Sequence, residues 1–557
     1  MKPSAHHGQT TVEQPRSRIM RSTAILLHLC RTTSFICLLA TSAPAANFVT
    51  ATPTAPHRGV WQIELSLDAP GGNPFLDVEL HFIFTLPDGK EIKAEGFYRG
   101  GNKWAGRAYC AQPGSWKWRS VANRPALDGQ RGTFEVRPSQ LPGKLRQHPQ
   151  DPRQFAYDNG EWFLHLGDTA YRYVTDTEPL WQQYMDEAAQ VGFNKIRTWF
   201  CRGRHDVAAL FAKDRQGLDL AYWDEMERRL IYALEKYPHV QFQLIPYGED
   251  WPELKRYGEE DRASLLVARY AQARFSAFPN VQWCISNDSH ISPGPGNRNA
   301  APATIHRIGR DLRAREPWGT LLSNHQQRFQ GYSFVDAEWS DIITLEDRDQ
   351  VAGALILQYR ALGNDPVVLD EDRYGAYISP KHDRYFFRRL MWASLLSGGH
   401  ATYGGLNTFV PYDGAAGTNG LHGYLTAVKE GRLDDGAADF RHLKSFFAGA
   451  KLTLVGLQPN DALGGNDGYS VKVIAGDKTL IAYLQNPDSR LPESANVAGS
   501  SAACRLHLPE GGWRIRWFDP RTGQWHANPE RHEISGGYTQ DFKSPFPGDA
   551  VLLLTLP

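Results

Sequence analysis

The sequence has no excess of either charge, since 61 Lys and Arg residues balance 61 Asp and Glu residues and give a formal net charge of +0. It also has no polybasic stretch, which argues against binding through the phosphate backbone of a nucleic acid. After the N-terminal segment, no apolar run reaches the length of a membrane span. We therefore expect neither a nucleic acid nor a membrane among the partners of this chain.

Cysteine is scarce and widely spaced. After the two cysteines of the N-terminal segment, the chain has Cys110, Cys201, Cys284 and Cys504, which form no CxxC pair and no metal-type spacing. The sequence also lacks an HExxH or His-x-His pattern. We expect no metal site and no cofactor, and we interpret the four cysteines as buried small apolar residues in preference to disulfides.

The N-terminus has the pattern of a secretory signal. Three arginines precede apolar stretches between residues 24 and 40, and a small-x-small pattern follows at 43–45. We predict a signal peptide over 1–46 and a secreted or periplasmic location for the rest of the chain. Translation from Met20 instead of Met1 would shorten the charged lead.

A chain of 557 residues is too long for one hydrophobic core, and its patterning changes twice. Short alternating runs separated by turns predict an antiparallel β-sandwich over 57–140. Alternating strand and helix patterns follow over 145–450, and strand-type alternation returns over 451–557. We predict a central barrel between two β-sandwiches.

The central segment contains eight apolar runs of strand length with amphipathic segments between them, which is typical of a (β/α)8 TIM barrel. A doubly wound sheet is the alternative, but its glycine fingerprint is missing after the first strand. The predicted strands are 162–167, 193–200, 240–246, 281–286, 320–323, 341–345, 366–369 and 400–403.

Two of these strands end in carboxylates. Asn287-Asp288 follows the fourth strand and Asp370-Glu371 follows the seventh. In a parallel barrel the carboxyl ends of the strands meet at one face, where catalytic groups lie. A glycosidase needs one carboxyl that donates a proton to the leaving oxygen and one carboxylate that attacks the anomeric carbon. We predict that Asp288 and Glu371 form this pair, and a separation of about 5–5.5 Å would imply retention.

Other polar residues at or near the predicted strand ends are candidates for substrate binding. Arg197 either orients Glu371 or neutralises the acidic face. Glu346 and Asp250 either contact sugar hydroxyls or form ion pairs with Arg202, Arg348 or Arg373. The candidates for substrate binding are Asp168, Asn287, His325, Arg197, Tyr247, Glu346 and Tyr374.

The pair Asn287-Asp288 resembles the Asn-Glu pair of clan A glycosidases, in which the Asn holds the 2-hydroxyl and the next residue is the acid/base. Aspartate is one methylene shorter, so the leaving group would have to lie closer. The segments LGDTAY (166–171), GFNKI (192–196), WCISND (283–288) and VVLDEDRY (367–374) together resemble the apiosidase-like barrels of glycoside hydrolase family 140.

This resemblance implies that Asp288 is the acid/base and Glu371 the nucleophile, with Asp168 and His325 lining the sugar subsite. The segment after Tyr374 departs from the Tyr-Glu-Gly pattern, which leaves the choice of sugar open. The first sandwich is similar to a domain that often precedes such barrels, and WFDPRTG (517–523) resembles a module named for collagen binding. We expect that module to brace the barrel and not to bind collagen.

The function that we expect is a secreted, retaining and exo-acting glycoside hydrolase that cleaves a sugar from a polysaccharide side chain. A catalytically inactive carbohydrate-binding scaffold is the alternative, although the intact carboxylates favour the enzyme. A third reading is another barrel hydrolase, either an inverting glycosidase or a peptidase, but no nucleophilic Ser or Cys arrangement supports a peptidase. The sequence carries no signal for the oligomeric state.

Overall fold

The computed structural model describes most of the chain after the N-terminal segment. The predicted signal peptide at 1–46 and the candidates Asp250 and Tyr374 lie outside the described residues. The described residues are 49–557 without 69–70, 172, 176–180, 202–206, 248–256, 258–261, 290–301, 347–350, 372–383, 404–435, 466–467, 490–498 and 528–531.

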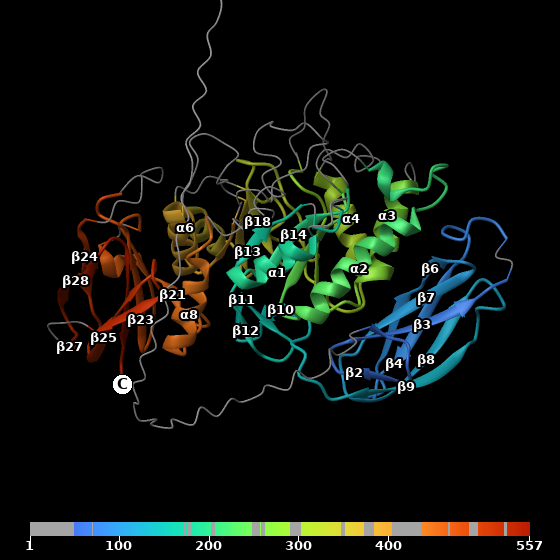
Figure 1. Cartoon of the computed structure of the whole chain (residues 1–557), viewed down its shortest axis with the longest axis horizontal. Coiled ribbons are helices and arrows are strands. Elements are labelled where there is room, and N and C mark those ends of the chain that lie inside the picture. The colour runs from blue at the N-terminus through green and yellow to red at the C-terminus, as the bar shows by residue number, and fades with distance from the viewer. Residues whose placement is uncertain are drawn as a thin grey trace, which may run out of the picture. The chain divides into compact units, whose positions relative to one another are not determined.

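The N-terminal domain is a β-sandwich, as predicted (blue in Figure 1). Along β8 every second residue is buried, and Trp116 and Trp118 lie among these inward residues. Trp61 stacks on Phe134 at 4.0 Å between ring centroids, so the tryptophans of this domain form its core. One sheet contains β1 (Val49–Thr50), β3 (Val60–Ser66), β7 (Lys103–Tyr109) and β6 (Phe97–Gly100). The other contains β2 (Thr54–Pro56), β9 (Arg131–Arg137), β8 (Gly114–Ala122), β4 (Leu80–Thr85) and β5 (Glu91–Glu95).

The central domain is the predicted TIM barrel. Its eight strands are parallel and hydrogen-bonded in the order β17-β16-β15-β14-β13-β20-β19-β18. Among the described strands, β17 and β18 are not paired with each other, so the barrel is nearly closed. The strands are β13 (Gly167–Thr169), β14 (Lys195–Trp199), β15 (Gln241–Ile245), β16 (Val281–Cys284), β17 (Leu322–Ser323), β18 (Ile343–Glu346), β19 (Val367–Glu371) and β20 (His400–Tyr403).

Helices follow most barrel strands and pack their apolar faces on the sheet. Helix α2 begins after Asp219, whose carboxylate accepts the backbone N–H groups of Ala221 and Tyr222. Helix α4 begins at Pro302, a residue that the first position of a helix tolerates because the N–H group there has no partner within the helix. The helices of the barrel are α1 (Trp181–Val191), α2 (Leu220–Lys236), α3 (Arg262–Phe275), α4 (Pro302–Arg315), α5 (Ala354–Arg360) and α6 (Arg384–Leu396), with the short 3-10 helix η1 (Ala208–Leu210) after β14.

The start of the barrel differs from the prediction. Residues 162–167 were expected to form the first barrel strand, but β12 (Trp162–Phe163) pairs antiparallel with β11 (Asp151–Tyr157). Strand β11 pairs in turn with β10 (Leu145–His148), and the first barrel strand is β13, which has three residues. The apolar run at 162–167 does form strand structure, but it is divided between two sheets. Periodicity identifies a strand without revealing which other strand it pairs with.

The connection between β17 and β18 also departs from a regular βα unit. Residues 324–342 are all described and contain no helix. Backbone hydrogen bonds hold its start against the loop after β16, because Ser289 N–H donates to the His325 carbonyl at 2.9 Å. Farther along, Tyr332 N–H donates to the Tyr359 hydroxyl at 2.8 Å. This helix-free connection therefore has a defined course close to the carboxyl ends of the strands.

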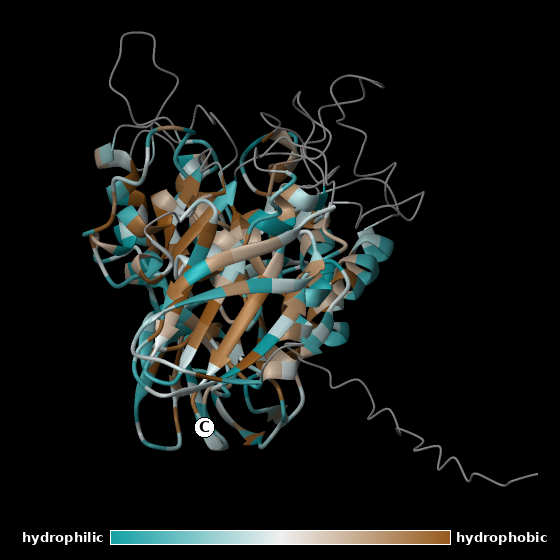
Figure 2. Ribbon diagram, turned by 90° about the vertical axis from the view of Figure 1, so that its left-hand side faces the viewer, coloured by the Kyte–Doolittle hydropathy of each residue, from teal (hydrophilic) through white to brown (hydrophobic). Residues whose placement is uncertain are grey.

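The C-terminal domain is a second β structure, as predicted, with its own apolar core. Helix α8 (Phe440–Ala450), which the sequence analysis did not predict, lies between it and the barrel, since Phe446 contacts both Trp392 and Phe518. In Figure 2, brown hydrophobic stretches run along the strands. The principal strands are β22 (Val471–Gly476), β23 (Thr479–Leu484), β29 (Ala550–Thr555), β25 (Gly512–Asp519) and β26 (Gln524–Ala527), with β24 (Ser501–His507) pairing β28 (Thr539–Pro547). Shorter elements are β21 (Gln458–Pro459), η3 (Asp461–Gly464) and β27 (Glu533–Ser535).

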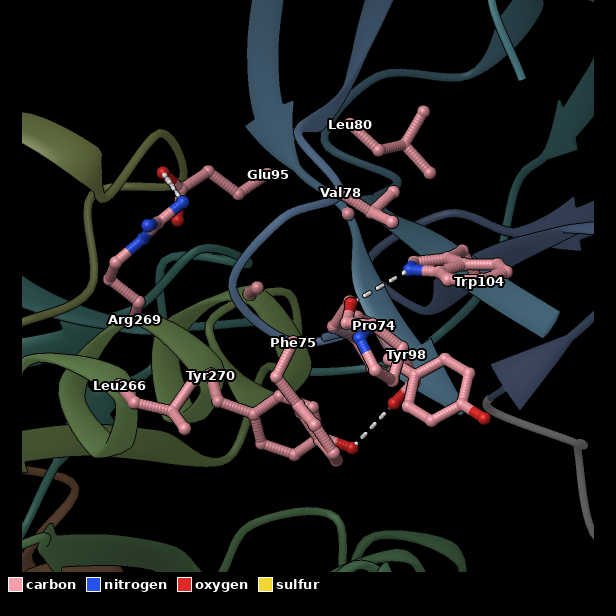
Figure 3. A pocket seen from close by; sticks show the side chains of 13 residues that line it. Pro74, Phe75, Val78, Leu80, Glu95, Tyr98, Trp104, Leu266, Arg269 and Tyr270 are labelled. Atoms are coloured by element: carbon pink, nitrogen blue, oxygen red, sulfur yellow. Dashed lines mark hydrogen bonds and ion pairs between the residues drawn. The ribbon is translucent and has the colours of Figure 1, made fainter. Parts of the chain in front are cut away.

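A buried ionic cluster joins the first sandwich to the barrel. Arg107 of β7 makes a two-pronged contact with Glu227 of α2, at 2.7 and 3.0 Å. Arg274 of α3 binds the same carboxylate at 2.6 Å. Beside it, Figure 3 shows a small cavity at the same junction, where Tyr270 of α3 donates a hydrogen bond to the Tyr98 carbonyl. The sandwich is thus anchored to the barrel by charge as well as by apolar packing.

The helices and the cysteines can be compared with the sequence-based expectations. Within the described residues, no helix has the length and apolarity that crossing a bilayer requires. Within the described part of the chain, the four cysteines after the N-terminal segment form no disulfide, and among these four Cys504 alone is partly exposed.

Candidate active site

A register irregularity aims two neighbouring carboxylates toward the same guanidinium. Leu345 of β18 pairs with Leu369 of β19, but the next residue, Glu346, pairs with Glu371, so Asp370 is an extra residue in the ladder. In a regular strand, consecutive side chains point to opposite faces, whereas an irregularity of this kind re-aims one of them. Both Asp370 and Glu371 therefore reach Arg197 of β14.

Asp370 lies inside the barrel and not at its open face. Its carboxylate forms an ion pair with Lys195, and Thr402 donates to it at 2.5 Å. Burial raises the pKa of Asp370, but the charges of Lys195 and Arg197 outweigh burial and place it far below the ordinary value. Asp370 is thus an ionised residue of the barrel interior that holds Arg197 in place below Glu371.

Glu371 is buried at the end of β19 and is held by two donors. The Tyr171 hydroxyl donates to Glu371 Oε2 at 2.8 Å, and Arg197 Nη1 donates to the same oxygen at 3.0 Å. Tyr171 is itself fixed by stacking on Trp199, with 4.3 Å between ring centroids. Two donors, one of them cationic, set the orientation of this carboxyl group.

Asp288 lies in the loop after β16, on a backbone with a φ of 45°, in the left-handed region that Asn and Asp tolerate better than most residues. Its neighbour Asn287 links it to the other carboxylate. Asn287 Nδ2 donates to Asp288 Oδ1 at 3.0 Å, while Asn287 Oδ1 accepts from Arg197 at 2.8 Å and lies 3.1 Å from the Tyr171 hydroxyl oxygen. The Asn287 amide therefore spans the space between the two candidate catalytic groups.

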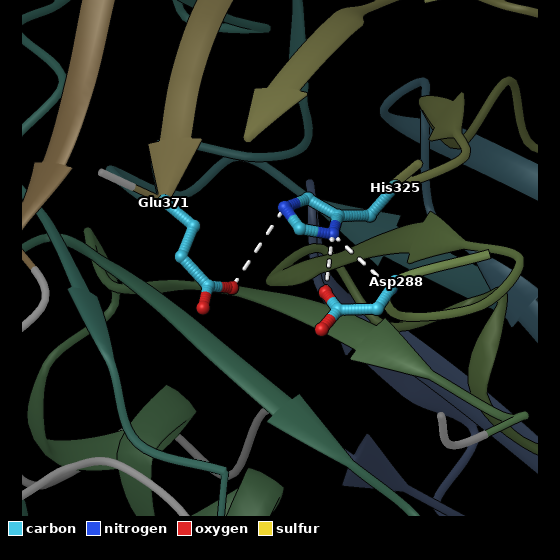
Figure 4. Close-up of side chains that lie close together, drawn as sticks. All are labelled: Asp288, His325 and Glu371. Carbon is cyan, nitrogen blue, oxygen red and sulfur yellow. Dashed lines mark hydrogen bonds and ion pairs between the residues drawn. The ribbon is translucent and has the colours of Figure 1, made fainter. Parts of the chain in front are cut away.

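His325 lies between the same two carboxylates (Figure 4). Its Nδ1 is 3.3 Å from Asp288 Oδ1, and its Nε2 is 3.8 Å from Glu371 Oε2. An oxygen of Asp288, a nitrogen of His325 and an oxygen of Glu371 all lie within 4.8 Å of one another. The fold therefore brings together residues that are 83 positions apart in the chain.

A third carboxyl group belongs to this cluster. Glu346, at the end of β18, is buried and forms an ion pair with Arg328 at 2.8 Å. Burial raises the pKa of Glu346, and the negative charges of Asp288 and Glu371 raise it further, so it lies well above the ordinary value. Its partner Arg328 differs from the arginines that the sequence analysis considered.

The pKa of Asp288 moves in the opposite direction. Burial raises it, but the hydrogen bond and charge of His325, the hydrogen bond with Glu346 and the charge of Arg197 outweigh burial. The result is a pKa below the ordinary value. Asp288 and Glu346 thus have environments that push their pKa values apart, which is the pattern of an acid–base pair.

Two other candidates are engaged by the scaffold. Asp168 of β13 is fully buried and accepts a hydrogen bond from Tyr184 of α1 at 2.5 Å. The Tyr247 hydroxyl donates to the Ser264 carbonyl at the start of α3 at 2.7 Å. Contact of either residue with a sugar stays a prediction. Tyr374 lies outside the described residues.

Several residues that the structure places at the site had no role predicted from the sequence. Tyr171 was part of a recognised motif, but nothing in the spacing indicated that its hydroxyl reaches Glu371. Arg328 lies in the helix-free connection after β17, and Lys195 is the first residue of β14. A polar residue at an inward position of a buried strand was the only available signal for Lys195.

Two carboxylates and an imidazole are also donor types that bind divalent cations. Here, however, the guanidinium of Arg197 lies 3.0 Å from Glu371 and 2.8 Å from Asn287, where its positive charge opposes a second cation. We therefore do not identify these groups as metal ligands. Their arrangement fits acid–base and nucleophilic chemistry between carboxyl groups.

Comparison with solved structures identifies proteins of the same fold. A candidate glycoside hydrolase from Bacteroides vulgatus ATCC 8482 superposes with a TM-score of 0.71 at 16% identity, covering 90% of this chain and 99% of its own. A glycoside hydrolase family 5 protein from the same organism gives a TM-score of 0.58 at 16% identity, with 75% and 95% covered. A further structure described as a glycoside hydrolase also gives 0.58 at 16% identity, with 75% and 98% covered.

Family comparison covers the two N-terminal domains. No curated protein matches the chain in sequence. Residues 58–123 of the first sandwich match a domain of unknown function named DUF5060. Residues 149–453, which make up most of the barrel and more than half of the chain, match the family "Apiosidase-like, catalytic domain". The chain therefore belongs to the apiosidase-like glycoside hydrolases.

Proposed function

We propose that this protein is a retaining, exo-acting glycosidase in which Glu371 is the nucleophile and Asp288 the acid/base. The observation that carries the proposal is the proximity of the two groups, whose carboxylate oxygens approach within 4.8 Å. Retaining enzymes hold their carboxyl groups about 5–5.5 Å apart, whereas inverting enzymes need about 6.5–9.5 Å to admit a water molecule. The short separation supports direct attack by a carboxylate.

The surroundings of Glu371 suit a nucleophile. Tyr171 and Arg197 both donate to Oε2, which fixes the orientation of the carboxyl group for attack on a bound sugar. In the first step Glu371 attacks the anomeric carbon while the leaving oxygen takes a proton from Asp288. In the second step Asp288 takes a proton from water, and the water oxygen displaces Glu371.

Asn287 is positioned to support both steps. Its Oδ1 accepts from Arg197 while its Nδ2 donates to Asp288, so its amide plane is fixed. We propose that this fixed amide holds the 2-hydroxyl of the sugar, where hydrogen bonds strengthen in the transition state. His325, between the two carboxylates, would line the same subsite. The substrate class is carbohydrate, and a side-chain sugar of a plant or microbial polysaccharide is our proposal within it.

The test is a screen of aryl glycosides and pectic oligosaccharides for release of a monosaccharide. We expect wild type to release one sugar, with the anomer first formed, read by NMR, matching that of the substrate. Glu371→Gln should lower kcat by about three orders of magnitude or more. The matched control is Glu338→Gln, an exposed carboxylate in the β17–β18 connection, which should leave kcat unchanged.

Several outcomes would contradict the proposal. Unaltered turnover by Glu371→Gln would remove the assigned nucleophile, and an inverted first product would exclude retention. Binding on a glycan array without any release would favour the inactive scaffold instead.

We further propose that the mature enzyme is exported after cleavage near residue 45. Expression of the full chain in a Gram-negative host, followed by mass spectrometry of the protein from the periplasm or medium, would reveal the new N-terminus. An intact N-terminus on cytoplasmic protein would contradict export.

A further inference from the structure

Glu346 occupies a position that the reaction as described does not use. It is the direct partner of Glu371 in the β18–β19 ladder, one strand away from the proposed nucleophile. Its Oε1 forms an ion pair with Arg328, so one half of the carboxyl group is compensated by a cation. The other half is Oε2, and the carboxyl group also lies within hydrogen-bond reach of the proposed acid/base, Asp288.

The second oxygen of Glu346, Oε2, has no N–H or O–H donor among the described residues. Glu346 Oε2 is buried, and among the described residues no N–H or O–H group lies within hydrogen-bond reach of it. A bare carboxylate oxygen that is buried without a donor, beside a second carboxylate, is costly. A hydrogen bond between two carboxyl groups requires that one of them carry a proton. The geometry therefore calls for one proton between Glu346 and Asp288.

The electrostatics agree with this placement. The pKa of Glu346 lies well above its ordinary value, first because of burial and then because of the charges of Asp288 and Glu371. The pKa of Asp288 lies below its ordinary value. Two carboxyl groups in contact titrate as a pair and lose their protons in two separated steps, so a single proton persists across a wide range of pH.

We propose that Asp288 and Glu346 share one proton, so that Glu346 is the reservoir from which Asp288 is supplied during catalysis. This inference rests on the proposed function. As the glycosidic C–O bond breaks, Asp288 delivers the shared proton, which it takes from Glu346, to the leaving oxygen. Both carboxyl groups are then ionised, and Arg328 stabilises Glu346. When water attacks the glycosyl-enzyme, its oxygen bonds to the anomeric carbon, the bond to Glu371 breaks, and the proton of the water passes to Asp288 and on to Glu346.

The proton held by Glu346 explains how Asp288 can act as an acid although its neighbours stabilise its ionised form. Alone, Asp288 would be held ionised by His325 and by the charge of Arg197. Four other charged or titratable groups among the described residues face this pair. His325 and Arg328 come from the β17–β18 connection, Glu371 from β19 and Arg197 from β14. Glu346 is thus a positioning residue that acts through Asp288.

The first experiment compares Glu346→Gln with Glu338→Gln on dinitrophenyl, nitrophenyl and phenyl glycosides of the sugar released in the screen. Glutamine can hydrogen-bond Asp288 but cannot supply a proton. We expect turnover of the phenyl glycoside to fall by about 100-fold or more. The dinitrophenyl glycoside, whose leaving group needs no proton, should keep its turnover within about tenfold. The basic limb of kcat/KM against pH should move to lower pH.

A purely structural role of Glu346 would give a different pattern of activity losses across the three glycosides. Equal losses on all three glycosides with an unchanged pH profile would overturn the inference, as would wild-type behaviour of Glu346→Gln. The control should retain wild-type behaviour throughout.

A second experiment needs no substrate and no active variant. The infrared difference spectrum between wild type and Glu346→Gln at neutral pH should contain the C=O stretch of one protonated carboxyl group. Absence of that band would overturn the shared proton. The band together with no sugar release by wild type would instead overturn the proposed function and retain the shared proton, so the two failures are distinguishable.

Discussion

Asp370 and Glu371 are adjacent in the chain, yet both carboxylates contact the guanidinium of Arg197. Nε of Arg197 lies 3.5 Å from Asp370 Oδ2, and Nη1 lies 3.0 Å from Glu371 Oε2. The irregular pairing of β18 with β19 makes this possible, because it removes the alternation that would separate neighbouring side chains. One arginine thus connects the ionic interior of the barrel with the proposed nucleophile.

Asp370→Asn should destabilise the protein strongly. It leaves the buried ammonium of Lys195 without its partner carboxylate, and breaking a buried ion pair costs about 3–5 kcal/mol. Urea unfolding would measure the change, with exposed Asp336→Asn as a control near wild type. Because the pKa of folded Asp370 lies far below that of the unfolded chain, its stabilisation is present above about pH 4 and declines as the pH falls. A wild-type stability at pH 7 for Asp370→Asn would contradict the ion pair.

Tyr171→Phe should lower activity while preserving the fold. The substitution removes the hydroxyl that donates to Glu371, but the stack of the ring on Trp199 remains. Loss of one such hydrogen bond to a charged group corresponds to about a 10- to 100-fold fall in kcat/KM. Steady-state kinetics and thermal unfolding would measure the two effects, with exposed Tyr538→Phe as the matched control. Equal activity of Tyr171→Phe and wild type would show that the hydroxyl does not act on the nucleophile.

Arg107→Met should weaken the junction between the first sandwich and the barrel. Burial raises the pKa of Glu227, but the charges of Arg107 and Arg274 outweigh burial and lower it to about 2. The stability that Glu227 contributes is therefore present above about pH 4 and declines as the pH falls toward 2. Removing one cation should cost about 3 kcal/mol at pH 7 and reduce this acid dependence. Unfolding curves between pH 3 and 7 would test this, with exposed Arg119→Met expected to match wild type.

Lys144 should make stability rise with pH above neutrality. Burial lowers its pKa to about 7, whereas a lysine in the unfolded chain titrates near about 10.4. Between these values the unfolded state binds more protons, so the free energy of unfolding rises with pH by up to about 1.4 kcal/mol per unit. Lys144→Met should abolish this rise while exposed Lys117→Met retains it. Melting temperatures from pH 7 to 10 would contradict the expectation if wild type and Lys144→Met changed in parallel.

Much of the architecture was predictable because the order of apolar and polar residues indicates where the strands and helices lie. The eighth strand has the predicted bounds, 400–403, and the six runs from the second to the seventh contain strands whose bounds lie within two residues of the prediction. The exception is 162–167, where an apolar run serves two sheets. Local pattern identifies a strand but not its partner, since pairing depends on contacts that are distant in sequence.

The candidate site was predictable in part for the same reason. Because the carboxyl ends of parallel strands converge, the sequence alone predicts that Asp288 and Glu371 lie close together. It did not anticipate that Asp370 faces the barrel interior, because a single extra residue in a ladder leaves no mark in the sequence. Nor did it anticipate Arg328, which reaches Glu346 from a connection without periodicity. Tertiary electrostatics of this kind arise only after the chain is folded.

The helix-free connection over 324–342 has an evolutionary consequence. It carries both His325 and Arg328, which contact Asp288 and Glu346, yet it contributes no helix to the outer layer of the barrel. Relatives could exchange this one segment for another without repacking the surrounding helices. The acidity of the proton donor could thus diverge between members independently of the strands that hold the carboxylates, which makes this connection a natural target for grafting between enzymes.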